Sequence, residues 1–104
     1  MSDPSNALRG EASLSIGENT FVLRPNFSAL VLAEDELGSL FALVERASGG
    51  SLTVAEVTCL LWHCLPTDNR PDRDTVGKAV IALGLIEAIK PIKTILSQVM
   101  KGGG

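Results

Sequence analysis

The spacing of hydrophobic and polar positions changes near Pro25. Before it, apolar side chains occupy every second position, first in "EASLSI" and again in "TFVLR", with "GEN" between the two runs. Alternation with a period of two is typical of a strand with one buried face, and a short glycine-containing connection indicates a β-hairpin. We therefore predict a hairpin over about residues 11-24. Because a lone hairpin is marginal in water, its apolar face must pack on the rest of the chain.

Beyond Pro25 the apolar positions recur every three or four residues, which is the spacing of an amphipathic helix. Polar capping residues and helix-stopping glycines and prolines divide this part into segments. The clearest start is "TVAE", Thr53 to Glu56, which has the sequence of a capping box. In the second segment, "LFALVERAS", we expect Leu40, Phe41 and Val44 to form the buried stripe. The predicted helices cover about residues 26-37, 39-48, 53-65, 73-83 and 87-101.

Two boundaries stay open at this level. Gly38 either separates two helices or lies inside a single helix over residues 27-48, where it would cost about 1 kcal/mol relative to alanine. Pro91 either stands in the first turn of the last helix or kinks a longer one. The predicted fold class is mainly α with a small β part, in which the N-terminal hairpin packs on a compact bundle of four to five short helices.

The chain is the length of one domain, since it has 104 residues. We expect residues 11-101 to form that domain. The polar segment 1-10 is predicted to be a disordered N-terminal segment, and residues 102-104 are predicted to be flexible C-terminal glycines.

Composition excludes several classes of partner. Nine basic and twelve acidic residues give a net charge of -3, which argues against a nucleic-acid partner, since that would favour a basic patch. No apolar run reaches the roughly 18–20 residues that a membrane helix needs, so no membrane association is expected. The N-terminus lacks the basic start and apolar core of a secretory signal. Two cysteines in such a chain favour reduced thiols and a cytoplasmic location.

The richest chemistry lies in "VTCLLWHCLP", residues 57-66. Cys59 and His63 share a helix face, but Cys64 lies about 140° around the helix from Cys59, so the three cannot easily meet on one metal ion. A cysteine nucleophile needs a depressed pKa, and apolar neighbours do not provide one. We therefore predict no catalytic, cofactor-binding or metal-binding residue and no cofactor. The acidic run "EDE", residues 34-36, is interpreted as a solvated face, with a patch for a basic partner as the alternative.

The last helical segment offers the best candidate for protein binding. Its apolar stripe has the 4-3 spacing of a helix seam and is widened on its flank by Ile95 and Met100. A core helix is the first interpretation of this stripe, and a partly exposed helix that binds a partner is the second. The stripe comprises Leu85, Ile89, Ile92, Leu96 and Val99. The candidate partner-binding residues are Ile92, Ile95, Leu96, Val99 and Met100.

The order of segments resembles a known family. The features that carry the resemblance are "GEASLSIGENTFVLRPNFSAL", "EDELGSLFALVERA", "LTVAEV" and "GLIEAIKPIKTIL", which together span roughly residues 8 to 101. They resemble the small tail proteins of gene transfer agents and siphophage-like prophages, a family described as tail-assembly chaperone or tail tube protein of the gene-transfer-agent type. None of these segments is catalytic.

The resemblance implies a non-enzymatic role in phage-type tail morphogenesis, in the cytoplasm of a bacterial host cell. A tail-assembly chaperone that binds the tape-measure protein is the first expectation, because a tube subunit should be mostly β and this chain predicts one hairpin. The alternative is a structural tube or connector subunit, located in the virion tail. The implied partner is the tape-measure protein or another tail protein, and a weak homo-oligomer is an open alternative. A small DNA-binding regulator and a thiol or zinc enzyme are the rival classes.

Overall fold

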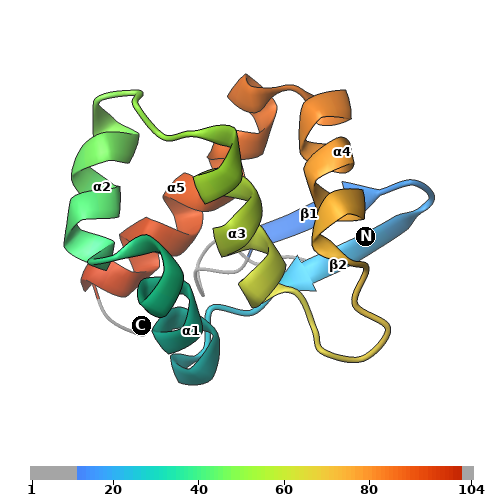
Figure 1. Cartoon of the computed structure of the whole chain (residues 1–104), viewed down its shortest axis with the longest axis horizontal. Helices are drawn as coiled ribbons and strands as arrows, with labels where there is room; N and C mark the ends of the chain where they lie inside the picture. Colours follow the sequence, from blue (N-terminus) through green and yellow to red (C-terminus); the bar gives the residue numbers. More distant parts are fainter. Residues whose placement is uncertain (1–11, 102–104) are drawn as a thin grey trace.

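The computed structural model describes residues 12–101. In chain order these form β1 (Ala12–Ile16), β2 (Asn19–Leu23), α1 (Phe27–Leu37), α2 (Leu40–Ser48), α3 (Val54–Cys64), α4 (Arg73–Leu83) and α5 (Leu85–Lys101). The predicted fold class is confirmed, since one antiparallel hairpin precedes five helices (Figure 1). The boundaries predicted for segments 1-10 and 102-104 lie outside the described residues.

The hairpin forms as the alternation predicts. Ala12 pairs with Leu23 and Leu14 with Phe21, so the apolar positions of both strands share one face. The two strands are joined by Gly17 and Glu18, which makes the turn one residue shorter than the predicted "GEN" loop. Gly17 has a φ of 62°, a left-handed conformation that glycine adopts without the steric cost other residues incur.

Each of the first four helices begins at a side-chain cap. The side-chain oxygens of Asn26, Ser39, Thr53 and Asp72 accept hydrogen bonds from backbone N–H groups in the first turns of α1, α2, α3 and α4, respectively. The predicted capping box at Thr53 is confirmed in both directions, because its hydroxyl accepts from the Glu56 N–H while the Glu56 carboxylate accepts from the Thr53 N–H. Gly38 has a φ of 85° and separates α1 from α2, so the alternative of a single helix over 27-48 is wrong.

The last helix is longer than predicted. It begins at Leu85, directly after Gly84, whereas the sequence predicted a start near residue 87. Gly84 ends α4 with a φ of 96°, and its carbonyl already accepts the N–H of Ala88, so α5 starts without an intervening loop. Pro91 therefore lies inside α5 and not in its first turn. Because proline has no backbone N–H, one carbonyl of the preceding turn lacks its usual helical donor.

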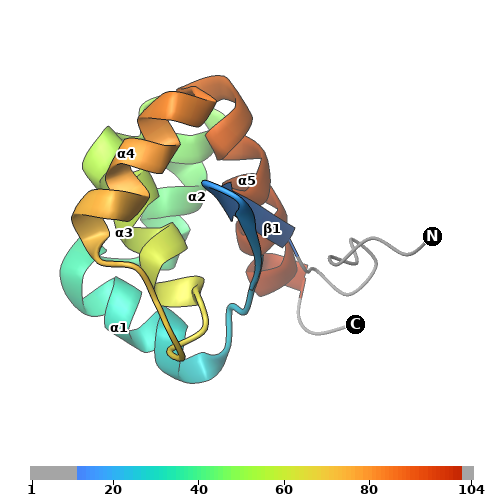
Figure 2. The same ribbon diagram turned by 90° about the vertical axis from the view of Figure 1, so that its right-hand side faces the viewer.

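Helix α3 occupies the centre of the molecule. It packs against α1, α4 and α5, and α2 packs on α5 at the far side (Figure 1). The hairpin lies against α5 and α4, and Figure 2 shows β1 beside α5. The core contains these largest fully buried side chains: Leu14, Leu23, Leu43, Leu60, Leu61, Cys64, Val76, Val80, Ile92 and Ile95. The hairpin thus covers one side of the helical core, as expected because an isolated hairpin is only marginally stable.

Candidate functional site

A polar cluster joins three helices at the carboxyl end of α3. Glu36 comes from the last turn of α1, His63 from the last turn of α3, and Arg73 is the first residue of α4. Arg73 donates from Nη1 to Glu36 Oε1 at 2.6 Å and from Nη2 to Glu36 Oε2 at 2.5 Å. His63 Nε2 lies 2.6 Å from the same Oε2, a distance at which the imidazole N–H donates to the carboxylate. One carboxylate therefore holds two partners that are distant in the sequence.

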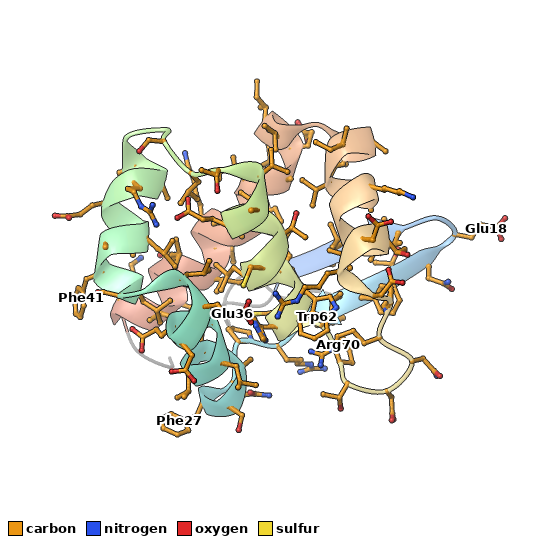
Figure 3. The ribbon with its side chains drawn as sticks, viewed as in Figure 1. Glu18, Phe27, Glu36, Phe41, Trp62 and Arg70 are labelled. Carbon is orange, nitrogen blue, oxygen red and sulfur yellow. The ribbon has the colours of Figure 1, made fainter. Side chains whose placement is uncertain are left out.

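Trp62 extends this cluster to the loop between α3 and α4. The guanidinium carbons of Arg70 and Arg73 lie 3.8 and 4.4 Å from its ring centroid, and its indole N–H donates to the Pro71 carbonyl at 2.9 Å. Figure 3 shows Glu36, Trp62 and Arg70 gathered near this end of α3. An exposed cation–π contact contributes about 0.5–1 kcal/mol, so the two stacked arginines fix the loop against α3.

The contacts shift the proton affinities of the acidic groups in predictable directions. Hydrogen bonds from Arg73, and then from His63, lower the pKa of Glu36 to about 2. Burial raises the pKa of the Cys59 thiol to about 11, with the negative charge of Glu36 acting in the same direction. Burial alone raises the pKa of the Cys64 thiol to about 12. Glu36 is therefore held as a carboxylate, and both thiols keep their protons at neutral pH.

Glu36, Cys59 and His63 are the one group in the described part of the chain that could hold a metal ion. One ligand atom from each lies within 4.8 Å of the others, and zinc accepts all three ligand types. The sequence prediction missed this convergence, because Glu36 belongs to another helix and was assigned to a solvated face. Both Glu36 oxygens, however, already bind Arg73, and the Cys59 thiol would have to ionise against its raised pKa. These contacts favour an ion-pair cluster that fastens α1 and α4 to α3.

The same geometry bears on thiol chemistry. A nucleophilic cysteine needs a thiolate, and the raised pKa of Cys59 makes that form scarce at neutral pH. His63 points its Nε2 toward Glu36, and its Nδ1 is buried without a hydrogen-bond partner among the described residues. The histidine is therefore placed to support the carboxylate, and the arrangement supplies no activated thiol.

The candidate partner-binding residues of α5 differ widely in exposure. Ile92 and Ile95 are fully buried and Leu96 is nearly so, so in this fold their side chains contact other helices and not a partner. Val99 is partly buried, and Met100 is 39% exposed. A partner-binding role for this set stays a prediction, and the burial confines direct contact to the carboxyl end of the helix.

Met100 and Leu96 line a groove between α2 and α5. Its volume is about 400 Å³, and its other lining residues are Val44, Ala47, Ser48, Lys93 and Ser97. The walls are mostly apolar, with one lysine among the lining residues. Such a groove has the chemistry that binds the apolar face of a helix.

Phe41 departs from its predicted place. The helical spacing assigned it to the buried stripe of α2, but its side chain is 72% exposed, and the buried positions are Leu40, Leu43 and Ala47. Phe27, the first residue of α1, is 83% exposed. Leu40, Leu43 and Ala47 follow one another at helical spacing, whereas Phe41 lies about 100° around α2 from Leu40. This offset is the sequence signal that could have placed Phe41 outside the buried stripe.

The sequence matches the family described as "Phage tail tube protein, GTA-gp10" over residues 9–102. Comparisons with curated proteins and with solved structures found no match. Among the described residues, no helix combines the length and the hydrophobicity that crossing a membrane requires. The match extends from just before the hairpin to the end of α5, so it covers every helix and strand together.

Proposed function

The chain belongs to the phage tail tube protein family of the GTA-gp10 type, and on this premise we propose that it is a non-enzymatic tail protein that acts by binding other tail proteins. The observation that carries the proposal is the family match across the whole folded region. The chemistry of the polar cluster supports it, because Glu36 is taken up by Arg73 and His63 and the neighbouring thiol is held protonated.

The family description favours a structural tail subunit, which the sequence analysis gave as its alternative. In that role the protein stays in the finished particle and contacts its neighbours permanently. The apolar groove between α2 and α5 would then be filled by an adjacent tail protein. Permanent contacts of this kind are usually large and apolar, so more of the exposed surface than this groove would take part.

The assembly chaperone is the second candidate, and one observation favours it. The described part of the chain has a single two-stranded sheet, whereas we expect the wall of a protein tube to need more strand from each subunit. In this role the protein would bind the tape-measure protein transiently and leave it as the tube closes. The groove beside Met100 suits such a contact. Its apolar lining can bind one face of a helix, and its small size limits the affinity, so that the helix can dissociate.

Mass spectrometry of purified particles separates the two roles. A structural subunit is retained at a fixed ratio to the major tail protein through successive density gradients. A chaperone is absent from finished particles and co-purifies with the tape-measure protein when tube assembly is blocked. If the protein is absent from particles and binds no tail protein in blocked cells, the proposed function is wrong.

A further inference from the structure

We propose that an exposed surface formed by α1 and α2 docks a segment of another tail protein whose apolar side chains are flanked by lysine or arginine. We call this the α1–α2 surface. Its apolar members are Phe27, Val31 and Phe41, and its acidic members are Glu34, Asp35 and Glu45. The inference rests on the proposed function, and it adds the chemistry of the partner and a contact surface centred on α1 and α2.

The two phenylalanines are the first reason. Phe27 and Phe41 are 83% and 72% exposed, although the chain has only three phenylalanines. Figure 3 shows Phe41 projecting outward from α2 at the left edge of the molecule and Phe27 projecting outward from α1 at its lower edge. Burying an apolar side chain of this size favours association, and aromatic residues are enriched at the centres of protein interfaces.

A direct contact joins the two helices at this surface. The Leu40 N–H donates to Glu34 Oε2 at 3.0 Å, so the side chain of Glu34 spans the corner between α1 and α2 beside Phe41. On α1, residues 27, 31 and 35 follow one another at intervals of four and therefore share a face. Glu45 lies one turn beyond Phe41 on α2 by the same spacing. The apolar and acidic groups thus alternate along two neighbouring helices.

The charge of this surface is the second reason. Helix α1 contains no lysine or arginine, and neither Asp35 nor Glu45 forms an ion pair with any described residue. The one arginine of α2, Arg46, is already paired with Glu56 of α3. A cationic partner would therefore meet negative charge that the protein itself does not neutralise.

A second exposed apolar area has a different electrostatic character. It lies at the turn from α4 to α5, where Ile86 is 79% exposed and Ile81 is also exposed. The charged residues next to it are paired within their own helices, Lys78 with Asp74 at 3.1 Å and Lys90 with Glu87 at 3.0 Å. In the described part of the chain, the α1–α2 surface therefore combines exposed aromatic side chains with unpaired acids, and the α4–α5 turn supplies an apolar control.

The α1–α2 surface continues toward the groove between α2 and α5. Val44 and Ser48, which line the groove, follow Phe41 at helical spacing on the same side of α2. An amphipathic helix laid along α2 would reach both Phe41 and the groove. Its apolar stripe would face these residues, and its basic residues would lie over Asp35 and Glu45.

The test uses the full-length protein and overlapping synthetic peptides that cover the other tail proteins of the same particle. Binding is measured by fluorescence anisotropy at low and high salt. We expect the bound peptides to be amphipathic and basic. Phe41→Ser should weaken binding more than ten-fold, as expected for an interface centre, and Glu45→Lys should weaken it several-fold and reduce its salt dependence. Ile86→Ser, which removes an equally exposed apolar side chain elsewhere, should change binding less than two-fold.

Circular dichroism of each variant establishes that it folds, and both Phe41 and Ile86 are exposed enough for that to be expected. The inference is overturned if the bound peptides are neutral or acidic, if no peptide binds, or if Ile86→Ser weakens binding as much as Phe41→Ser. Sedimentation showing that the protein self-associates through Phe41 would assign the surface to a second copy of this chain and also overturn it. None of these outcomes alters the particle mass spectrometry, so failure of the inference is distinguishable from failure of the proposed function.

Discussion

Glu36 illustrates what single residues reveal and what they conceal. Its position in an acidic run on an amphipathic helix predicts a solvated side chain, and its side chain is indeed 39% exposed. Yet its oxygens bind Arg73, which is 37 positions away in the sequence, and His63, which is 27 positions away. Spacing within one helix carries no information about partners on other helices, so this cluster could not be predicted from the sequence. The capping box at Thr53 was predictable because both of its partners lie within four residues.

The depressed pKa of Glu36 predicts a specific acid sensitivity. Its pKa is 4.5 for an isolated group and about 2 in the folded protein, so the carboxylate contributes stability that is complete above its unfolded pKa. That contribution is lost as the pH falls through the folded value. We expect Glu36→Gln to lower the urea midpoint at pH 7 and to flatten its decline between about pH 5 and pH 2 relative to the wild type. Asp35→Asn, which removes a neighbouring exposed carboxyl without an ion pair to any described residue, should follow the wild-type profile.

Removal of the capping box tests a local contact. Thr53→Ala eliminates the hydroxyl that accepts the Glu56 N–H at 3.1 Å, and this change should destabilise the protein by about 1 kcal/mol. Thr53→Ser keeps a hydroxyl in the same place and should preserve most of the stability. The two variants are compared by denaturant midpoint, and equal losses would show that the hydroxyl is not what caps α3.

At the scale of whole helices and strands, the period of the apolar positions predicted the hairpin and the helical part that follows it. The capping residues, glycines and prolines divided that part into four to five helices, of which the structure has five. The errors fall where two local signals compete. The predicted stripe of α2 included both Leu40 and Phe41, but only Leu40 is buried, because Phe41 lies about 100° further around the helix. Pro91 left two positions open, in the first turn of the last helix or inside a longer one, and the second is correct because α5 begins at Leu85, directly after Gly84.

Two lysine substitutions in α5 separate its core side from its accessible end. Ile95 is fully buried, so Ile95→Lys should unfold the protein or destabilise it by about 3 kcal/mol or more. Met100 is 39% exposed at the mouth of the α2–α5 groove, so Met100→Lys should leave the circular dichroism spectrum unchanged.

Co-purification with the tape-measure protein, or with another tail partner, then reports on binding. We expect Met100→Lys to reduce it, because a charged side chain would enter an apolar groove. A folded Met100→Lys protein that binds as well as the wild type would place the contact elsewhere on the surface, and the α1–α2 surface is the next candidate.

For the molecule as a whole, the fold class and the family could be predicted from the sequence, but the set of apolar residues that stay exposed on the surface could not. The core could be predicted since burial of the apolar stripes leaves few ways to assemble five short helices and a hairpin. The exposure of an apolar residue depends on how closely α1, α2 and α5 pack against one another. The hydrophobic spacing within a single helix does not reveal that packing. The partner-binding residues predicted in α5 are therefore mostly core residues. Phe27 and Phe41 are far more exposed to solvent, and only the folded structure identifies them.

The central claim is that this protein acts in building a phage-type tail. Electron microscopy of particles from cells lacking the gene, with the gene restored in trans as control, tests it most directly. Both the structural and the chaperone role predict heads without tails, or tails of abnormal length, and restoration of normal tails by the wild-type gene. Tailed particles of normal length and number in the absence of the gene would contradict the account.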